Sequence, residues 1–167
     1  MTLYPILLEM KKLLKNTDGW LDKAVAHASA KGYDANGLLQ ARLAPDMFPL
    51  VQQFQSACDN AKFAAAFTTG KEPPVHADTE KTIDEVRARI ASVVSYLDGF
   101  TSKDFEGTDS RAVRRPRWEG KSMTGTDYFV EQAMPNFFFH LTTAYALLRH
   151  NGVDVGKRDY LGRITLR

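Results

Sequence analysis

Residues 134–152 read MPNFFFHLTTAYALLRHNG, and they form the most apolar long segment of the chain. Asn136 and His140 stand four residues apart within it, so they share one face if the segment is a helix. The dipeptide Asn151-Gly152 follows as a typical helix stop signal. The segment therefore predicts a helix that carries one polar pair among apolar neighbours, and the rest of the chain is interpreted around it.

The same helix is expected to begin near Thr126, before Pro135. Proline has no backbone N–H and its ring crowds the preceding turn, so a kink or a restart is expected there. One face of the segment mixes apolar and polar side chains: Phe129, Ala133, Asn136, His140, Thr143 and Leu147. If that row faces the core, it brings a histidine and an amide into the protein interior.

Three more segments have helical periodicity. The first is residues 3–31, which carry apolar or small residues along one face and end at Gly32. The second is expected to begin at Asp46, with Pro49 in its first turn.

The third of these segments is expected to begin after a cap at Asp78 or Thr79. It has the most regular amphipathic pattern of the chain, which runs through Ile83, Val86, Ile90, Val93, Leu97 and Phe100. Arg87 and Arg89 lie off that apolar row.

Four helices, few strand signals and loops of mixed length predict an all-α protein built as an antiparallel four-helix bundle. The 167 residues fit one domain, 1–167. The longest irregular stretch is the loop of residues 101–125 before the last helix, with short extended pieces expected within residues 112–118. The tail, residues 153–167, lacks a helical period, so it is either a docked extension or a disordered end.

The composition is that of an ordinary globular protein, with 44% hydrophobic and 25% charged residues. A net charge of +2 is too small to imply a nucleic-acid partner. No apolar run approaches the ~18 residues of a membrane span, and the N-terminus lacks the features of a signal peptide. We therefore expect no membrane association and a cytoplasmic location. The small neighbours of the single cysteine, Cys58, predict a buried structural thiol.

The polar residues of two helices suggest a site in the bundle interior. Asp46 and Gln53 are seven residues apart and would share one face of the second helix. If the N-terminal parts of the two helices meet, both side chains converge with Asn136 and His140. A histidine, a carboxylate and amide oxygens can bind a divalent metal. The hypothesis makes His140, Asp46 and Asn136 metal ligands, with Gln53 in contact with a bound ligand.

Each of these residues also has a purely structural interpretation. Asp46 can be only a helix cap. His140 can be a buried histidine that bonds Asp46, Gln53 or a backbone carbonyl without any metal. Asn136 can satisfy backbone groups that a kink at Pro135 leaves free.

The irregular loop is rich in cations, which are Arg111, Arg114, Arg115, Arg117 and Lys121, against the single Glu119. With Trp118 they could bind phosphate or a nucleic-acid backbone. No nucleic-acid-binding motif accompanies them. The favoured interpretation is a solvated loop, or one paired with acidic residues such as Asp98, Asp104, Glu106 and Asp109.

Two motifs, LAPDMFPL at 43–50 and PNFFFHLTTAYALLRHNGVDVGKRDYLG at 135–162, resemble an uncharacterised bacterial branch of the DinB/YfiT-like metalloenzyme superfamily. The resemblance implies a four-helix bundle that is often dimeric, so a homodimer is expected. It also implies a nickel or zinc site made by three histidines, one from the second helix and two from the later helix. Known members include thiol-dependent transferases and isomerases.

In this chain Asn136 and His140 occupy the places of the histidine pair, and the second helix has no histidine. The nearest polar substitutes there are Asp46 and Gln53. The resemblance thus implies a divalent-metal site with a histidine-poor ligand set. The alternative is a metal-free bundle that binds a small molecule or a protein partner and whose polar core residues form a hydrogen-bond network.

Overall fold

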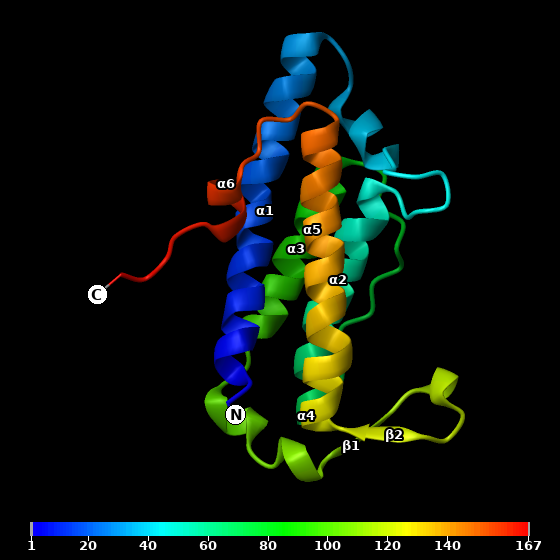
Figure 1. Ribbon diagram of the computed structural model, residues 1–167, viewed down its shortest axis with the longest axis vertical. Helices are drawn as coiled ribbons and strands as arrows, with labels where there is room; N and C mark the ends of the chain where they lie inside the picture. The colour runs from blue at the N-terminus through cyan, green and yellow to red at the C-terminus, as the bar shows by residue number, and fades with distance from the viewer. Residues whose placement is uncertain (1, 167) are drawn as a thin grey trace.

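The computed structural model describes residues 2–166. Four long helices form the bundle, namely α1 (Tyr4–Lys31), α2 (Leu50–Thr69), α3 (Ile83–Asp98) and α5 (Met134–His150). Figure 1 shows them side by side along the long axis of the molecule. The predicted all-α bundle is confirmed.

The connection of residues 70–82 returns along the length of the bundle, so α2 and α3 run in the same direction (Figure 1). Two hydrogen bonds mark its course. The Tyr96 hydroxyl donates to the Glu72 carbonyl (3.0 Å), and the Gln55 amide donates to Glu80 Oε2 (2.8 Å). The predicted antiparallel packing therefore holds for α2 against α5 and for α1 against α3, but α2 and α3 are parallel.

Shorter elements fill the connections, and they are η1 (Ala35–Gln40), η2 (Ser102–Phe105), η3 (Thr108–Ser110), β1 (Ala112–Arg114), η4 (Pro116–Trp118), β2 (Ser122–Thr124), α4 (Gly125–Asp127), η5 (Tyr128–Ala133) and α6 (Lys157–Leu161). Strands β1 and β2 pair antiparallel, with Val113 opposite Met123. The expected extended piece within residues 112–118 is thus one strand of a hairpin that projects from one end of the bundle (Figure 1).

Helix α2 begins later than the sequence pattern predicts. Its first residue is Leu50, and Pro49 before it is extended (φ −68°, ψ 166°). A residue before proline is disfavoured in the α conformation, so Phe48 cannot carry a helix into Pro49. Asp46 lies in an exposed turn ahead of α2. The prediction that Asp46 starts this helix is therefore wrong.

The start of α3 differs from the prediction, whereas the end of α1 agrees with it. Thr82 caps α3 and forms a reciprocal capping box with Glu85, so the predicted cap at Asp78 or Thr79 is wrong. The paired donor and acceptor of this box outweigh a single acidic cap further upstream. Gly32 ends α1 in the left-handed conformation (φ 74°), as predicted.

The last helix is interrupted just before Pro135, as predicted. The segment η5 is π-helical, and the Met134 N–H donates to the Phe129 carbonyl five residues back. A wider turn accommodates a proline that lacks an N–H and crowds the turn before it. Beside the interruption, the Asn136 side-chain amide donates to the Gln132 carbonyl (2.6 Å). The alternative role proposed for Asn136, a bond to backbone near the kink, is therefore present.

The tail is docked on α1 through α6. The Trp20 indole N–H donates to the Asp159 carbonyl (3.1 Å), and the Tyr160 ring stacks on Trp20 with centroids 5.5 Å apart. Lys23 pairs with the Asp159 carboxylate at 2.7 Å. Of the two alternatives for the tail, the docked extension is correct as far as residue 163, whose carbonyl accepts from Lys12 Nζ (3.5 Å).

The core is apolar and contains the predicted row of α3. Cys58 is fully buried, and burial raises the pKa of its thiol to about 12, so the thiol is uncharged and the structural interpretation is confirmed. Among residues 2–166, no helix is both long and apolar enough to cross a lipid bilayer.

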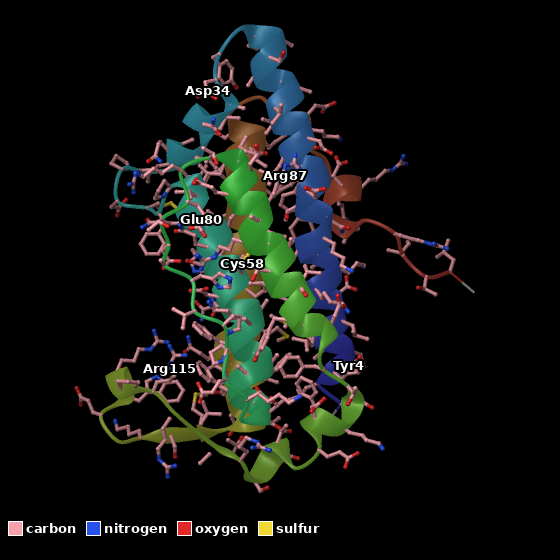
Figure 2. All side chains as sticks on the ribbon, turned by 180° about the vertical axis from the view of Figure 1, so that it is seen from behind. Tyr4, Asp34, Cys58, Glu80, Arg87 and Arg115 are labelled. Atoms are coloured by element: carbon pink, nitrogen blue, oxygen red, sulfur yellow. The ribbon has the colours of Figure 1, made fainter. Side chains whose placement is uncertain are left out.

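A buried ionic network joins α2, α3 and the connection between them. Arg89 is only 3% exposed, although it lies off the apolar row. Its guanidinium pairs with Asp59 at 2.6 Å, Asp78 at 2.5 Å and Glu80 at 3.0 Å. Figure 2 shows Glu80 on the connection that covers the α2 side of the bundle.

The same network continues through Lys62 to His76. Lys62 pairs with Asp59 at 2.7 Å, and its Nζ lies 3.0 Å from Nδ1 of His76. A lysine ammonium only donates, so Nδ1 accepts and His76 carries its proton on Nε2, next to the Ser92 hydroxyl at 3.2 Å. His76 is therefore neutral here, and it ties the connection to both helices.

We predict that Arg89→Met lowers the free energy of unfolding by about 3 kcal/mol or more, because it leaves three carboxylates without their buried partner. Arg87 on the same helix pairs with the exposed Asp18 and Asp22. Arg87→Met should therefore cost about 1 kcal/mol or less. Urea unfolding of both variants measures the difference, and equal losses would contradict the structural role given to Arg89.

Candidate functional site

Gln53 and His140 join α2 to α5. Gln53 is 1% exposed, and its Oε1 lies 2.8 Å from Nδ1 of His140. The other end of the amide donates from Nε2 to the Phe48 carbonyl (3.0 Å), which fixes its orientation. Because a carbonyl oxygen only accepts, Nδ1 carries the imidazole proton, and the lone pair is on Nε2.

The environment of His140 keeps the imidazole neutral and partly open. Burial lowers its pKa below the ordinary value. The Phe48 ring stacks near it with centroids 6.3 Å apart, and Phe139 meets it edge-on at 5.1 Å. Nε2 of His140 has no hydrogen bond to residues 2–166. It is not fully buried, because the only fully buried side-chain nitrogen or oxygen without a partner in those residues is Nε of Arg89. The Nε2 lone pair is therefore accessible to a ligand.

A cavity of about 220 Å³ lies beside His140. Its walls come from α2, η5, α5 and the hairpin, through the side chains of Ser56, Asp59, Asn60, Phe63, Arg115, Arg117, Tyr128, Gln132, Asn136 and His140. Most of these side chains are polar and uncharged. The cavity is thus suited to a small polar molecule.

Two guanidinium groups of the hairpin reach this cavity. Arg115 lies over the rings of Phe67 and Phe63, at 4.5 and 5.0 Å from their centroids. Figure 2 places Arg115 at the hairpin end of the bundle, beside the ribbon of α2. Burial raises the pKa of Tyr128, and the positive charges of Arg115 and Arg117 oppose that rise. Both guanidinium groups are therefore close to the Tyr128 phenol.

Of the two interpretations of the basic loop, the structure shows a solvated loop and not the pairing with acidic residues. The exposed cations are Arg111, Arg114, Arg117 and Lys121. Asp98 pairs with Lys11 and Asp104 with Lys71, each at 2.7 Å. In the described part of the chain, neither Arg115 nor Arg117 has a carboxylate within 4.0 Å. Their charges are thus directed to the cavity and to solvent.

The four residues predicted to converge do so only in part. Gln53 and His140 share a hydrogen bond, as the structural interpretation of His140 proposed. Asn136 lines the cavity with His140. Asp46 lies outside it, because α2 starts four residues later and the turn that carries Asp46 is exposed. The convergence of Asp46 with the other three is therefore wrong.

Sequence reasoning missed most of the α2 wall. Ser56 and Asn60 follow Gln53 by three and seven residues, so helical spacing places both near the face of Gln53, but neither was assigned to the site. Asp59 is adjacent to that row, and its Oδ1 is held by Arg89 and Lys62. No local signal shows that a hairpin more than fifty residues further on returns to the same cavity.

The side chains present do not fit a resident nickel or zinc ion. No group of three or more His, Cys, Asp or Glu side chains in residues 2–166 could hold one, and His140 is the only nitrogen ligand at the cavity. A catalytic zinc site typically has three protein ligands. The single carboxylate of the cavity, Asp59, already pairs with Arg89 and Lys62. The two guanidinium groups of the hairpin would repel a metal cation.

Comparisons with known proteins agree on a family. A family model described as a domain of unknown function, DUF1993, matches residues 3–161. The crystal structure of a DinB family member protein from Shewanella denitrificans is 47% identical in sequence, and the match covers 99% of this chain and 94% of that chain. The two structures superpose with a TM-score of 0.95. No curated protein matches this chain.

We predict a loss of stability on mild acidification. Burial lowers the pKa of His140, and burial together with nearby Lys62 lowers that of His76, whereas both groups titrate near pH 6.5 when unfolded. As the pH falls through that value, the unfolded chain takes up protons that the folded chain resists. The stabilisation is therefore complete above about pH 6.5 and is lost below it.

Unfolding in urea between about pH 5.5 and 7 measures this slope, since carboxylates contribute mainly at lower pH. The double variant His76→Gln/His140→Gln should flatten it. His150→Gln, at the exposed end of α5, is the matched control. An unchanged slope in the double variant would show that other groups cause the acid sensitivity.

Proposed function

This chain belongs to the DUF1993 family with a DinB-like fold, and from that premise we propose that it binds a small polar molecule in the cavity between α2 and α5 without a resident metal ion. The observation that carries the proposal is the Gln53–His140 hydrogen bond at 2.8 Å. It fixes a neutral imidazole with its Nε2 lone pair open to the cavity.

The size and the walls of the cavity support this function. About 220 Å³ corresponds to the liquid volume of roughly seven water molecules, below the ~300 Å³ at which pockets for drug-sized ligands begin. The Asn60 and Asn136 side chains use their amide groups on the Ser56 and Gln132 carbonyls, at 2.8 and 2.6 Å. Their carbonyl oxygens remain as acceptors for a ligand.

A nickel- or zinc-binding protein is the second candidate, and one observation favours it. A metal-binding histidine usually donates its other ring N–H to a fixed acceptor, as Nδ1 of His140 does to Gln53. The remaining donors are amide oxygens and a carboxylate that two cations already hold. This donor set favours the metal-free proposal. The homodimer implied by the resemblance and the cytoplasmic location both stay predictions.

We predict that a compound from a panel of amino acids, hydroxy acids, polyols and phosphate esters raises the melting temperature of the wild-type protein. A hundredfold excess over the dissociation constant adds about 2.7 kcal/mol of stability, and each kcal/mol is worth roughly 2–4 °C at this chain length. His140→Gln should abolish the shift and His150→Gln should retain it. A shift that survives in His140→Gln would place binding elsewhere.

We predict no near-stoichiometric metal in protein purified without a metal-affinity tag, nor after incubation with nickel, zinc or manganese. Elemental analysis of wild type and His140→Ala in parallel measures this. Near-stoichiometric metal in the wild type that disappears in His140→Ala would overturn the metal-free part of the proposal, and thiol-transfer assays would then be the next step.

A further inference from the structure

The basic hairpin brings positive charge to the cavity in a fixed position. Val113 of β1 is buried, and the ring of Trp118 meets the ring of Tyr128 edge-on at 6.1 Å. The Gly125 N–H donates to the Arg111 carbonyl (2.8 Å) and closes the base of the hairpin. The hairpin is therefore anchored at both its base and its tip.

Arg115 is held by aromatic rings and not by an acid. Its guanidinium lies over Phe67 and Phe63, and this cation–π packing leaves the N–H donors at its edge available for hydrogen bonds, one of which reaches the Tyr128 phenol. A guanidinium matches the geometry of carboxylate and phosphate oxygens and binds them through two parallel hydrogen bonds. The neighbouring Arg117 lines the same cavity.

The charge balance of the cavity favours an anion. Two guanidinium groups face one carboxylate, and the Oδ1 atom of that carboxylate, Asp59, is bound by Arg89 at 2.6 Å and Lys62 at 2.7 Å. His140 is neutral, so it adds no charge. The Tyr128 phenol, buried and close to both guanidinium groups, offers a further donor.

We propose that Arg115 and Arg117 form an oxyanion clamp, so that the molecule bound in the cavity carries a carboxylate or phosphate group together with hydroxyl or amino groups. The oxyanion binds at the clamp. A hydroxyl or amino group of the same molecule donates to Nε2 of His140. This inference rests on the proposed function, because it specifies the ligand class of that same cavity.

The test is calorimetric titration with five probes of known composition. Inorganic phosphate and glycerol phosphate represent phosphates, acetate and glycerate represent carboxylates, and glycerol is the uncharged control. We expect saturable binding of glycerol phosphate or glycerate, weaker binding of inorganic phosphate or acetate, and none of glycerol. Whichever pair binds identifies the source of the oxyanion.

Variants of the hairpin locate the binding. Loss of a hydrogen bond to a charged group costs roughly tenfold or more in affinity, so Arg115→Gln and Arg117→Gln should each weaken binding by about that factor. Arg114→Gln is the matched control, since Arg114 lies on β1 but does not line the cavity. Arg115→Lys keeps the charge but loses the paired donors, so its binding affinity should lie between that of Arg115→Gln and that of the wild type. Trp118 fluorescence verifies that the hairpin remains folded.

Two results would overturn the clamp. One is the absence of binding by all four anions, and the other is equal affinity in wild type and Arg115→Gln/Arg117→Gln. The proposed function fails separately: it survives if uncharged compounds bind in a His140-dependent manner while the anions do not, and it fails if no compound depends on His140.

Discussion

The hydrogen bond between Gln53 and His140 sets the geometry on which the candidate site depends. It spans the α2–α5 interface, and both ends of the Gln53 amide have partners, so neither the amide nor the imidazole can rotate without leaving a buried polar group unpaired. Such a loss costs about 1–3 kcal/mol. The bond also decides the tautomer of His140. One contact therefore aligns two helices and aims a nitrogen lone pair at the cavity.

Asp59 connects the cavity to the ionic network on the other side of α2. Its Oδ1 atom accepts from Arg89 and Lys62, which belong to that network. The network in turn holds the connection of residues 70–82 through Asp78, Glu80 and His76. Because the network compensates Asp59, the cavity retains the charge of the two hairpin guanidinium groups. The fold of the connection thus influences the charge of the site.

Features that depend on helical periodicity were predicted correctly from the sequence. Features that depend on contacts between distant segments were not. The apolar row of α3, the stop at Gly32 and the interruption at Pro135 follow from local spacing and from the geometry of glycine and proline. The prediction that Asp46 starts α2 was wrong for a local reason that the sequence already contained: Pro49 disfavours the helical conformation at Phe48. Arg89 lies off the apolar row, yet it is buried with its acidic partners. Those partners are Asp59, Asp78 and Glu80, and the periodicity of α3 alone cannot predict them.

The site predictions divide in the same way. The i and i+4 spacing of Asn136 and His140 correctly placed both at one cavity, and the bond from His140 to Gln53 was among the alternatives. The hairpin contribution depends on β1 and β2 pairing and on Arg115 stacking over Phe67, which are long-range contacts. The local sequence pattern indicates only that residues 111–121 are basic.

The histidine-poor lining of the cavity and the basic hairpin are consistent with each other. The resemblance implies a superfamily site in which three neutral histidines bind a divalent cation. Here one of the pair is Asn136, α2 offers amides and a compensated carboxylate, and two guanidinium groups approach the same space. A cation in that space would meet repulsion without a ligand set to offset it. An oxyanion would meet paired donors in a partly dehydrated cavity, where charge-assisted hydrogen bonds are strongest. The proposed anion clamp thus places positive charge in the space where the resemblance led us to expect a metal ion.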